Sequence, residues 1–131
     1  MPGFKKTITL IEVIISLFVI SIIVSTVLPL SEKAIRLEKE HLLLLRLRQI
    51  RYAIDSYFKK NGEKNYPISL EVLVKEKYLR RIPKDPMTKK NQWKQISSID
   101  APGEAYSGHD VFDIRSLSTK KSLNGENYNE W

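Results

Sequence analysis

Residues 8–30, ITLIEVIISLFVISIIVSTVLPL, decide how the rest of the chain is organised. The run is apolar apart from small hydroxyl side chains, and Glu12 is its only charged residue. At about 1.5 Å of rise per residue, a helix of this length crosses the roughly 30 Å hydrocarbon core of a bilayer. Only a helix satisfies its own backbone polar groups in lipid. We therefore predict a transmembrane helix, in which an ionised Glu12 needs a partner.

Two other interpretations of this run are weaker. A cleaved secretory signal has a shorter apolar core followed by a small-residue cleavage site, and neither is present. A buried core helix would need protein around it, and the remainder of the chain is enough only for one small domain. Pro29 removes a backbone donor, so we expect a kink or a looser helix around Thr26.

The helix is expected to continue from Ser31 to Lys60 with one apolar side. Residues 42–45 are four consecutive leucines, which surround most of the helix, so we expect neighbouring subunits to cover the part that the domain leaves open. Asn61-Gly62 is a typical helix end. The apolar stripe has spacings of four, three, four and three, which place it on one face of a helix: Leu43, Leu47, Ile50, Ile54 and Tyr57.

The second half of the chain predicts a small α+β domain. We expect a short helix over 69–77, with Ser69 as its N-cap and a hydrophobic staple between Ile68 and Leu73. Prolines keep the segment 78–86 extended.

Strands are predicted over 93–99 and 111–117, with a third strand near Tyr106, in a three-stranded antiparallel sheet. Asp100 to Gly103 reads as the turn between strands. The sheet is expected to pack onto the apolar stripe of the long helix through Val111, Ile114 and Leu117.

The composition excludes several classes of function. There is no cysteine, so disulfide and thiol chemistry are excluded. His41 and His109 occur singly and no glycine-rich phosphate loop is present, so we expect no enzyme activity. The formal net charge of +7 is spread along the chain, which favours a solvated surface over a nucleic-acid stripe.

The basic residues before the apolar run predict the topology. Lys5 and Lys6 lie directly in front of it. Because positive residues that flank a span stay on the cytoplasmic side, we expect the N-terminus inside and the domain outside.

The stretch KKTITLIEV, residues 5–13, together with the apolar run that follows, resembles the N-terminal signature of type IV pilins and type II secretion pseudopilins. In that family a short basic leader is removed, the fifth residue after the cut is a glutamate, and the twenty-second is commonly a proline. Counted from Ile8, Glu12 is fifth and Pro29 is twenty-second. The resemblance therefore implies cleavage between Thr7 and Ile8.

One position departs from the family's pattern. Glycine usually precedes the cut, and here that residue is Thr7. Gly3-Phe4 is the alternative cleavage point, but a cut there would make Glu12 the ninth residue. The favoured register implies a leader of 1–7, a transmembrane helix of 8–30 and a pseudopilin domain of 31–131.

The resemblance extends through the second half of the chain. A Tyr66-Pro67 pair, a short helix and the segment Arg80–Pro86 are similar to the major pseudopilin of type II secretion, and so is DVFDIRSLS at 110–118. A polar loop that ends at Trp131 follows. Type IV pilins often close such a loop with a disulfide, so the absence of cysteine points to the pseudopilins.

The resemblance implies a structural role. The protein would be a subunit of a helical pseudopilus of type II protein secretion, rooted in the bacterial inner membrane with its domain in the periplasm. Its Ile8 amine would be methylated, and Glu12 of one subunit would pair with the Ile8 ammonium of another. The implied partners are further copies, other pseudopilins, the prepilin peptidase and the inner-membrane assembly platform. A type IV pilin or competence pseudopilin that binds a surface ligand or DNA is the alternative, supported by the basic charge.

Calcium is the one cofactor that the resemblance raises. The family's major pseudopilins bind it in the C-terminal loop, through carbonyls near a serine-leucine pair and through aspartates. Here Lys120 stands where the first aspartate is expected, and Glu126 and Asn127 replace a pair of aspartates. We therefore expect severely weakened calcium binding, with Leu117, Glu126 and Asn127 as the candidate ligands. Lys120 is expected to replace the ion by pairing with Glu126.

The cleavage register gives the first prediction. Intact mass spectrometry of the membrane-extracted protein should show that residues 1–7 are missing, and the added mass of one methyl group would report N-methylation of Ile8. A chain that begins at Phe4 would contradict this register. A chain that keeps Met1 would show that Thr7 blocks the cut.

Overall fold

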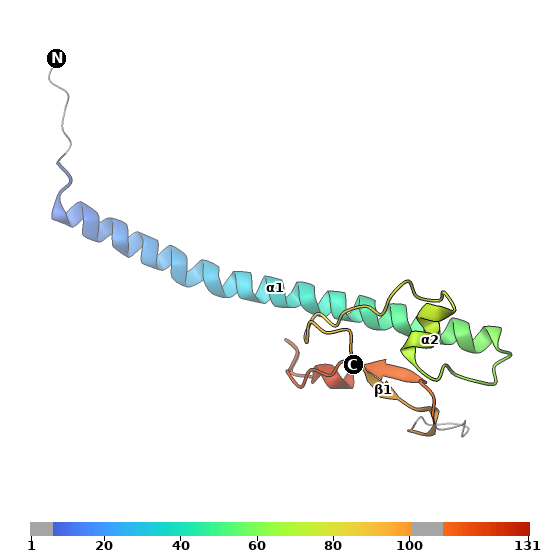
Figure 1. The fold of residues 1–131 in the computed structure, drawn as a ribbon. Helices are drawn as coiled ribbons and strands as arrows, with labels where there is room; N and C mark the ends of the chain where they lie inside the picture. Colours follow the sequence, from blue (N-terminus) through green and yellow to red (C-terminus); the bar gives the residue numbers. More distant parts are fainter. Residues whose placement is uncertain (1–6, 101–108) are drawn as a thin grey trace, which may run out of the picture. The chain divides into compact units, whose positions relative to one another are not determined.

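The computed structural model describes residues 7–100 and 109–131 (Figure 1). The chain divides into two compact units, of which the first ends at Arg36 and the second begins at Leu37. The elements in order are α1 (Leu10–Lys60), α2 (Leu70–Lys75), β1 (Lys94–Ile96), the 3-10 turn η1 (Ser98–Asp100), β2 (Asp113–Arg115) and the 3-10 turn η2 (Tyr128–Glu130).

The first unit contains the N-terminal part of α1, and all of its described residues, 7–36, are exposed. Its hydroxyl groups bond within the helix: the side chains donate to carbonyls three or four residues earlier, at 2.6 to 3.2 Å. This back-bonding satisfies these hydroxyl donors within the helix, which is what a helix in hydrocarbon requires. The residues concerned are Ser16, Ser21, Ser25, Thr26 and Ser31.

Pro29 lies inside α1, and the helix is continuous through it. Thr26 bonds the carbonyls of Ile22 and Ile23 in the turn before the proline. A continuous helix can still be bent, so the kink expected around Thr26 stays a prediction.

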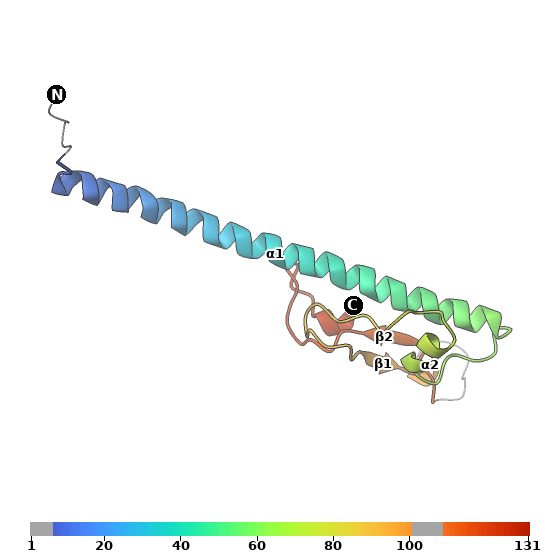
Figure 2. The ribbon, with the colours of Figure 1, turned by 45° about the horizontal axis from the view of Figure 1, so that its top comes forward.

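In the second unit, α1 buries the predicted apolar stripe. Leu43, Leu47, Ile50 and Ile54 are all buried, and Tyr57 packs against the same cluster. This confirms the helical period inferred from the sequence. Figure 2 shows α2 and the two strands on one side of this part of α1, and the stripe shares one buried cluster with residues of α2 and β2.

The end of α1 is confirmed at Lys60, directly before Asn61-Gly62. Gly62 adopts a φ of +71°, a left-handed conformation that glycine takes without a steric penalty. The Glu63 amide then donates to the Phe58 carbonyl at 3.0 Å, which satisfies one of the carbonyls left open at the helix end.

The short helix is present, with narrower bounds than predicted. Ser69 occupies the N-cap position of α2, but its side chain makes no capping hydrogen bond. The predicted staple is wrong: Leu73 is buried in the core, whereas Ile68 is 74% exposed. The reason lies one residue earlier, because the buried Pro67 accepts a hydrogen bond from the Val111 amide at 2.7 Å, and the chain then turns Ile68 outward.

The sheet consists of two short antiparallel strands among the described residues. In β1 and β2, Gln95 lies opposite Ile114. Both strands are shorter than predicted. The expected third strand near Tyr106 lies outside the described residues, as does most of the expected turn from Asp100 to Gly103.

Packing of the second strand is confirmed for Val111 and Ile114, which are both buried, but not for Leu117, which is 46% exposed. Side chains alternate along an extended chain, so Ile114 and Ser116 share the inner side and Leu117 points the other way. The buried Ser116 hydroxyl donates to the Asp85 carboxylate.

The segment from Tyr78 to Pro86 contains no helix, as predicted. Asp85 is fully buried and also accepts a hydrogen bond from the Met87 amide at 2.8 Å. The Trp93 indole donates to the Pro83 carbonyl at 2.9 Å. The proline-rich segment is therefore tied into the core by buried polar contacts as well as by apolar ones.

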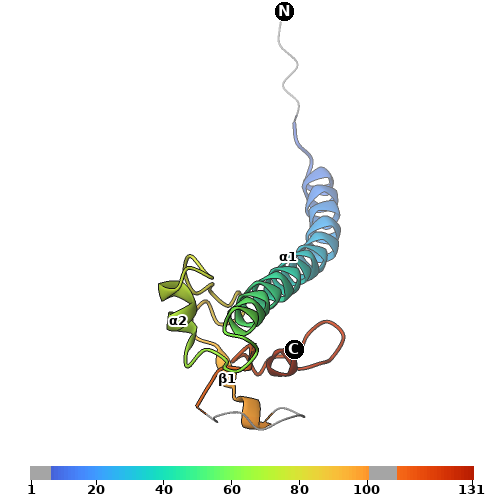
Figure 3. The same cartoon turned by 90° about the vertical axis from the view of Figure 1, so that its right-hand side faces the viewer.

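Viewed from the end of α1, α2 lies on one flank of the helix and the C-terminal segment lies on the other (Figure 3). The core is a single cluster of buried residues. Its members come from α1, α2, β2, η2 and the segments around Leu79, Trp93 and Val111.

Two leucines on the same helix test the importance of the stripe. Leu47→Ala should lower the free energy of unfolding by about 2–5 kcal/mol, because it opens a cavity in the core. Leu44→Ala, at a side chain that is 45% exposed, should change it by about 0.5 kcal/mol or less. Urea denaturation of the full chain in neutral detergent, followed by tryptophan fluorescence, measures both values. Equal losses would show that the stripe is not what holds the domain on α1.

Candidate functional site

The residues predicted for processing and assembly lie at the start of α1. Thr7 and Ile8 precede the helix and are exposed. Glu12 lies in the first turn of α1, which begins at Leu10, two residues after Ile8. Within the part of the chain that the structure describes, the Glu12 carboxylate has no hydrogen-bond or ion-pair partner. The arrangement thus offers an unpaired carboxylate close to the predicted new amino terminus.

The surroundings of Glu12 in the chain are apolar from Ile8 to Leu30. Among the described residues, α1 is the one helix long and apolar enough to span a membrane, and the apolar window is not buried by any other part of the protein. Pro29 is exposed near the end of this stretch. Length and composition are therefore compatible with a span, and they leave Glu12 as the charged group on this surface.

A second cluster of predicted site residues belongs to the C-terminal loop. The loop is closed by its own backbone: the Ser122 amide donates to the Glu126 carbonyl at 2.7 Å, and the Tyr128 amide donates to the Lys120 carbonyl at 3.1 Å. Lys121 and Asn127 form a β-bridge between these two contacts.

Glu40 on α1 fixes this loop. One oxygen of its carboxylate accepts hydrogen bonds from the Leu123 amide at 2.8 Å and from the Tyr128 hydroxyl at 2.7 Å. Glu40 is 7% exposed, so both bonds lie in a site that largely excludes water. A buried carboxylate is tolerated where hydrogen bonds compensate its desolvation, and here they come from the loop.

The residues of the loop do not fit a calcium site. Leu117 and Glu126 are exposed, and Asn127 uses its side-chain amide to donate to Glu130 at 3.3 Å. The carbonyls of Lys120 and Glu126 are already bonded within the loop. Across residues 7–100 and 109–131, no group of three acidic, histidine or cysteine side chains is placed to hold a metal ion.

Lys120 was predicted to pair with Glu126 in place of a calcium ion. In the described part of the chain, no ion pair joins these two residues. The cross-link that the loop does have comes from Glu40, which the sequence analysis did not single out.

Arg51 is a second polar residue of α1 whose partners lie far along the chain. Its guanidinium pairs with the Asp113 carboxylate at 2.7 Å, and it also donates to the Ile114 and Trp131 carbonyls, each at 3.1 Å. One side chain thus joins α1 to β2 and to the C-terminal segment. No local sequence signal could have identified it, because all three partners lie far along the chain.

Asp110 joins the residues that follow β1 to those that precede β2. Its carboxylate accepts hydrogen bonds from the Ser98 amide at 3.0 Å, from the Ser98 hydroxyl at 2.7 Å and from the Ser97 hydroxyl at 3.0 Å. Burial alone would raise the pKa of Asp110, but these donors outweigh it and hold the pKa below the usual 3.8. The ionised group therefore contributes stability that is present above pH 3.8 and is lost as the pH falls through the lowered pKa.

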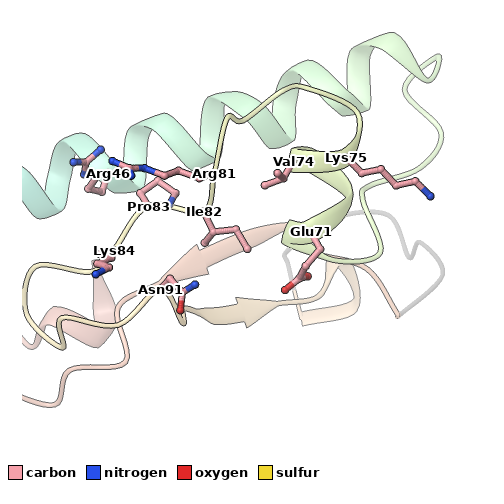
Figure 4. Close-up of a pocket in the computed structure, with 9 residues that line it drawn as sticks. All are labelled: Arg46, Glu71, Val74, Lys75, Arg81, Ile82, Pro83, Lys84 and Asn91. Carbon is pink, nitrogen blue, oxygen red and sulfur yellow. The ribbon is translucent and has the colours of Figure 1, made fainter.

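A basic groove lies on another part of the second unit. It comprises two adjoining cavities of about 720 and 650 Å³, which share Arg46, Arg81 and Pro83. Figure 4 shows the larger cavity, with Arg46 of α1 and Arg81 at one end and Glu71 of α2 at the other. Among the residues that the structure describes, Glu71 is the only acidic one that lines either cavity.

Comparison with protein-family models, with curated proteins and with solved structures gives no match to this chain. The function is therefore inferred from the residues of this chain and from the resemblance of its N-terminal segment to that of pilins and pseudopilins.

Exchanging the Glu40 side chain tests how the loop is held. Glu40→Ala removes the acceptor that the Leu123 amide and the Tyr128 hydroxyl share, and it should lower the free energy of unfolding by about 1–3 kcal/mol. Hydrogen exchange at the Leu123 amide should become faster. Glu38→Ala, at an exposed glutamate two residues earlier, is the matched control and should alter neither quantity. Unchanged exchange at Leu123 in Glu40→Ala would mean that the loop holds itself.

Proposed function

We propose that this protein is a structural subunit of a pseudopilus, of the kind that serves type II protein secretion. In this role α1 anchors the chain in the bacterial inner membrane by residues 8–30, with the N-terminus in the cytoplasm and the domain in the periplasm. After removal of residues 1–7, copies assemble into a helical fibre through the N-terminal part of α1. The energy for assembly comes from partner proteins, because this chain offers no set of residues suited to nucleotide chemistry.

The single observation that supports this role most is the continuity of α1. One helix carries an exposed apolar surface with a lone carboxylate, and further along it carries the buried stripe of a folded domain. A membrane anchor alone would need the apolar part but not Glu12. A soluble domain alone would need the stripe but not the exposed apolar residues. A fibre subunit uses both, since its helices pack on one another outside the domain.

The charge of Glu12 provides the assembly chemistry. An ionised carboxylate in hydrocarbon costs a few kcal/mol on insertion scales, and a partner cation offsets this cost. Cleavage after Thr7 creates an ammonium on Ile8. Within one subunit this group precedes α1 in the chain, whereas Glu12 lies on the first turn of the helix. Between staggered subunits the two groups can approach side by side, so pairing favours assembly over the isolated chain.

The exposed leucines of α1 extend the same interface into the domain. Leu42 and Leu44 remain 38% and 45% exposed. Further copies, together with other pseudopilins, are the partners that would cover them. The prepilin peptidase and the inner-membrane assembly platform are the remaining partners of this proposal.

Substitutions of Glu12 separate assembly from folding. Glu12→Val and Glu12→Gln should insert at least as readily as the native chain and keep the folded domain, but should build no filaments, because the Ile8 ammonium then has no counter-charge. Glu12→Asp should retain part of the activity if reach is what matters. Electron microscopy of filaments sheared from overexpressing cells, with circular dichroism of the extracted subunit, gives both readouts.

The control for these variants is Glu32→Gln, which removes an exposed carboxylate of α1 beyond the apolar run. It should leave filament number unchanged. Filaments of native number and length from Glu12→Val would defeat the assembly role, and Glu12 would then be an interfacial carboxylate favoured by the helix dipole.

A further inference from the structure

The basic groove gathers cations without matching acids. Among the described residues, none of the six basic side chains that line it forms an ion pair. Arg46 donates only to the neutral Gln49 side chain, at 3.4 Å. Elsewhere in the same unit an arginine does find a carboxylate, as Arg51 does in Asp113. The six residues are Arg46, Arg48, Lys75, Arg80, Arg81 and Lys84.

Clustering of like charges works against folding, and an anionic ligand would relieve it. Arg46 and Arg81 are the two charged residues that line both cavities, so their charges act on the whole groove. A guanidinium presents a planar fork of donors that matches a carboxylate in a bidentate geometry. The groove is thus suited to hold carboxylates at its centre.

Between the charges the groove is apolar. Val74 and Ile82 line the larger cavity, Leu45 and Leu79 line the smaller, and Pro83 lies where the two meet. Each cavity has the volume of a typical ligand pocket, which is enough for apolar side chains. An apolar floor with a charged rim is the arrangement of a protein-binding surface.

We propose that this groove is a docking site for an acidic peptide segment of another protein, in which acidic and apolar residues alternate. Its carboxylates pair with Arg46 and Arg81, while its apolar side chains enter the two cavities. This proposal is independent of the assembly role assigned to the N-terminal part of α1.

The charge pattern of this chain argues against a second copy as the occupant. Four of its exposed acids, Glu32, Glu38, Glu63 and Glu76, have a lysine as a direct neighbour. A second copy that docked through one of these acids would bring a cation to the groove together with the carboxylate.

Nucleic acid fits the groove less well. Sequence-tolerant binding of single strands uses aromatic side chains on which successive bases stack. The described lining has two aromatic side chains, and the ring of one of them, Tyr78, is engaged in an edge contact with Tyr57. Tyr52, which is 74% exposed, could therefore stack one base but not a succession of bases, and the remaining uncharged lining is mainly aliphatic. The apolar floor thus favours a peptide over a polynucleotide.

Fluorescence anisotropy with a short labelled peptide that alternates Glu and Leu tests the proposal. The full chain in neutral detergent micelles is titrated, with empty micelles as the blank. Arg46→Gln/Arg81→Gln should weaken binding about tenfold, because it removes the two central charge contacts. A peptide with Ser in place of Leu should also bind several-fold more weakly, and added salt should lower the affinity.

The matched control is Lys64→Gln/Lys94→Gln, which removes the same charge from exposed positions outside the groove. It should change the affinity less than twofold, and circular dichroism should show both double variants to be folded. Equal weakening by the two double variants would overturn the proposal, because binding would then follow net charge alone. Tighter binding of a thymidine oligonucleotide of equal charge would also overturn it. The proposal would also be overturned if sedimentation showed self-association of the chain and if Arg46→Gln/Arg81→Gln abolished it.

Discussion

Burial of one side of α1 is the interaction on which the second unit depends. A domain of this size buries a modest share of the surface of its unfolded chain, so it has little apolar contact to lose. The stripe from Leu43 to Ile54 supplies the middle of its single core cluster, and α2, the segment around Trp93 and the second strand all pack against that cluster. The two short strands could not hold together alone, since an isolated two-stranded sheet is marginal in water. The helix is therefore the support on which a sheet this small can exist.

Polar contacts then determine where the chain crosses this core. Arg51 holds the second strand, Glu40 holds the C-terminal loop, and Asp85 joins the proline-rich segment to Ser116. In each case a buried or half-buried group meets backbone or side-chain partners from distant parts of the chain. Each of these side chains would be costly to bury alone, so it stabilises only the arrangement in which its partners are present. Apolar burial makes the domain compact, whereas these contacts select one path for the loops.

Apolar burial could largely be predicted from the sequence, whereas the polar contacts between distant segments could not. Apolar periodicity predicted the buried stripe of the long helix, and the candidate N-cap Ser69 predicted the start of α2, because these signals depend on neighbours within a turn or two. Apolar periodicity also placed both described strands. It failed at Leu117, where β2 has already ended at Arg115 and the alternation continues with a buried Ser116 instead. Glu40 could not be recognised from sequence, because a glutamate that bonds an amide 83 positions away looks the same as a solvated one. The basic groove escaped prediction for a similar reason, since Arg46 and Arg81 meet only in the folded domain.

The position of Glu40 along α1 has a mechanical consequence. It is the first residue of the helix that is buried, ahead of Leu43. A load that enters the domain through the N-terminal part of α1 therefore reaches the bonds of Glu40 to Leu123 and Tyr128 before it reaches the apolar stripe. Two hydrogen bonds on one carboxylate oxygen share that load, and they pass it to a loop that is closed by its own backbone. Traction on the helix is thus distributed to the far end of the sequence at the point where it enters the fold, so the domain resists being peeled from its helix turn by turn.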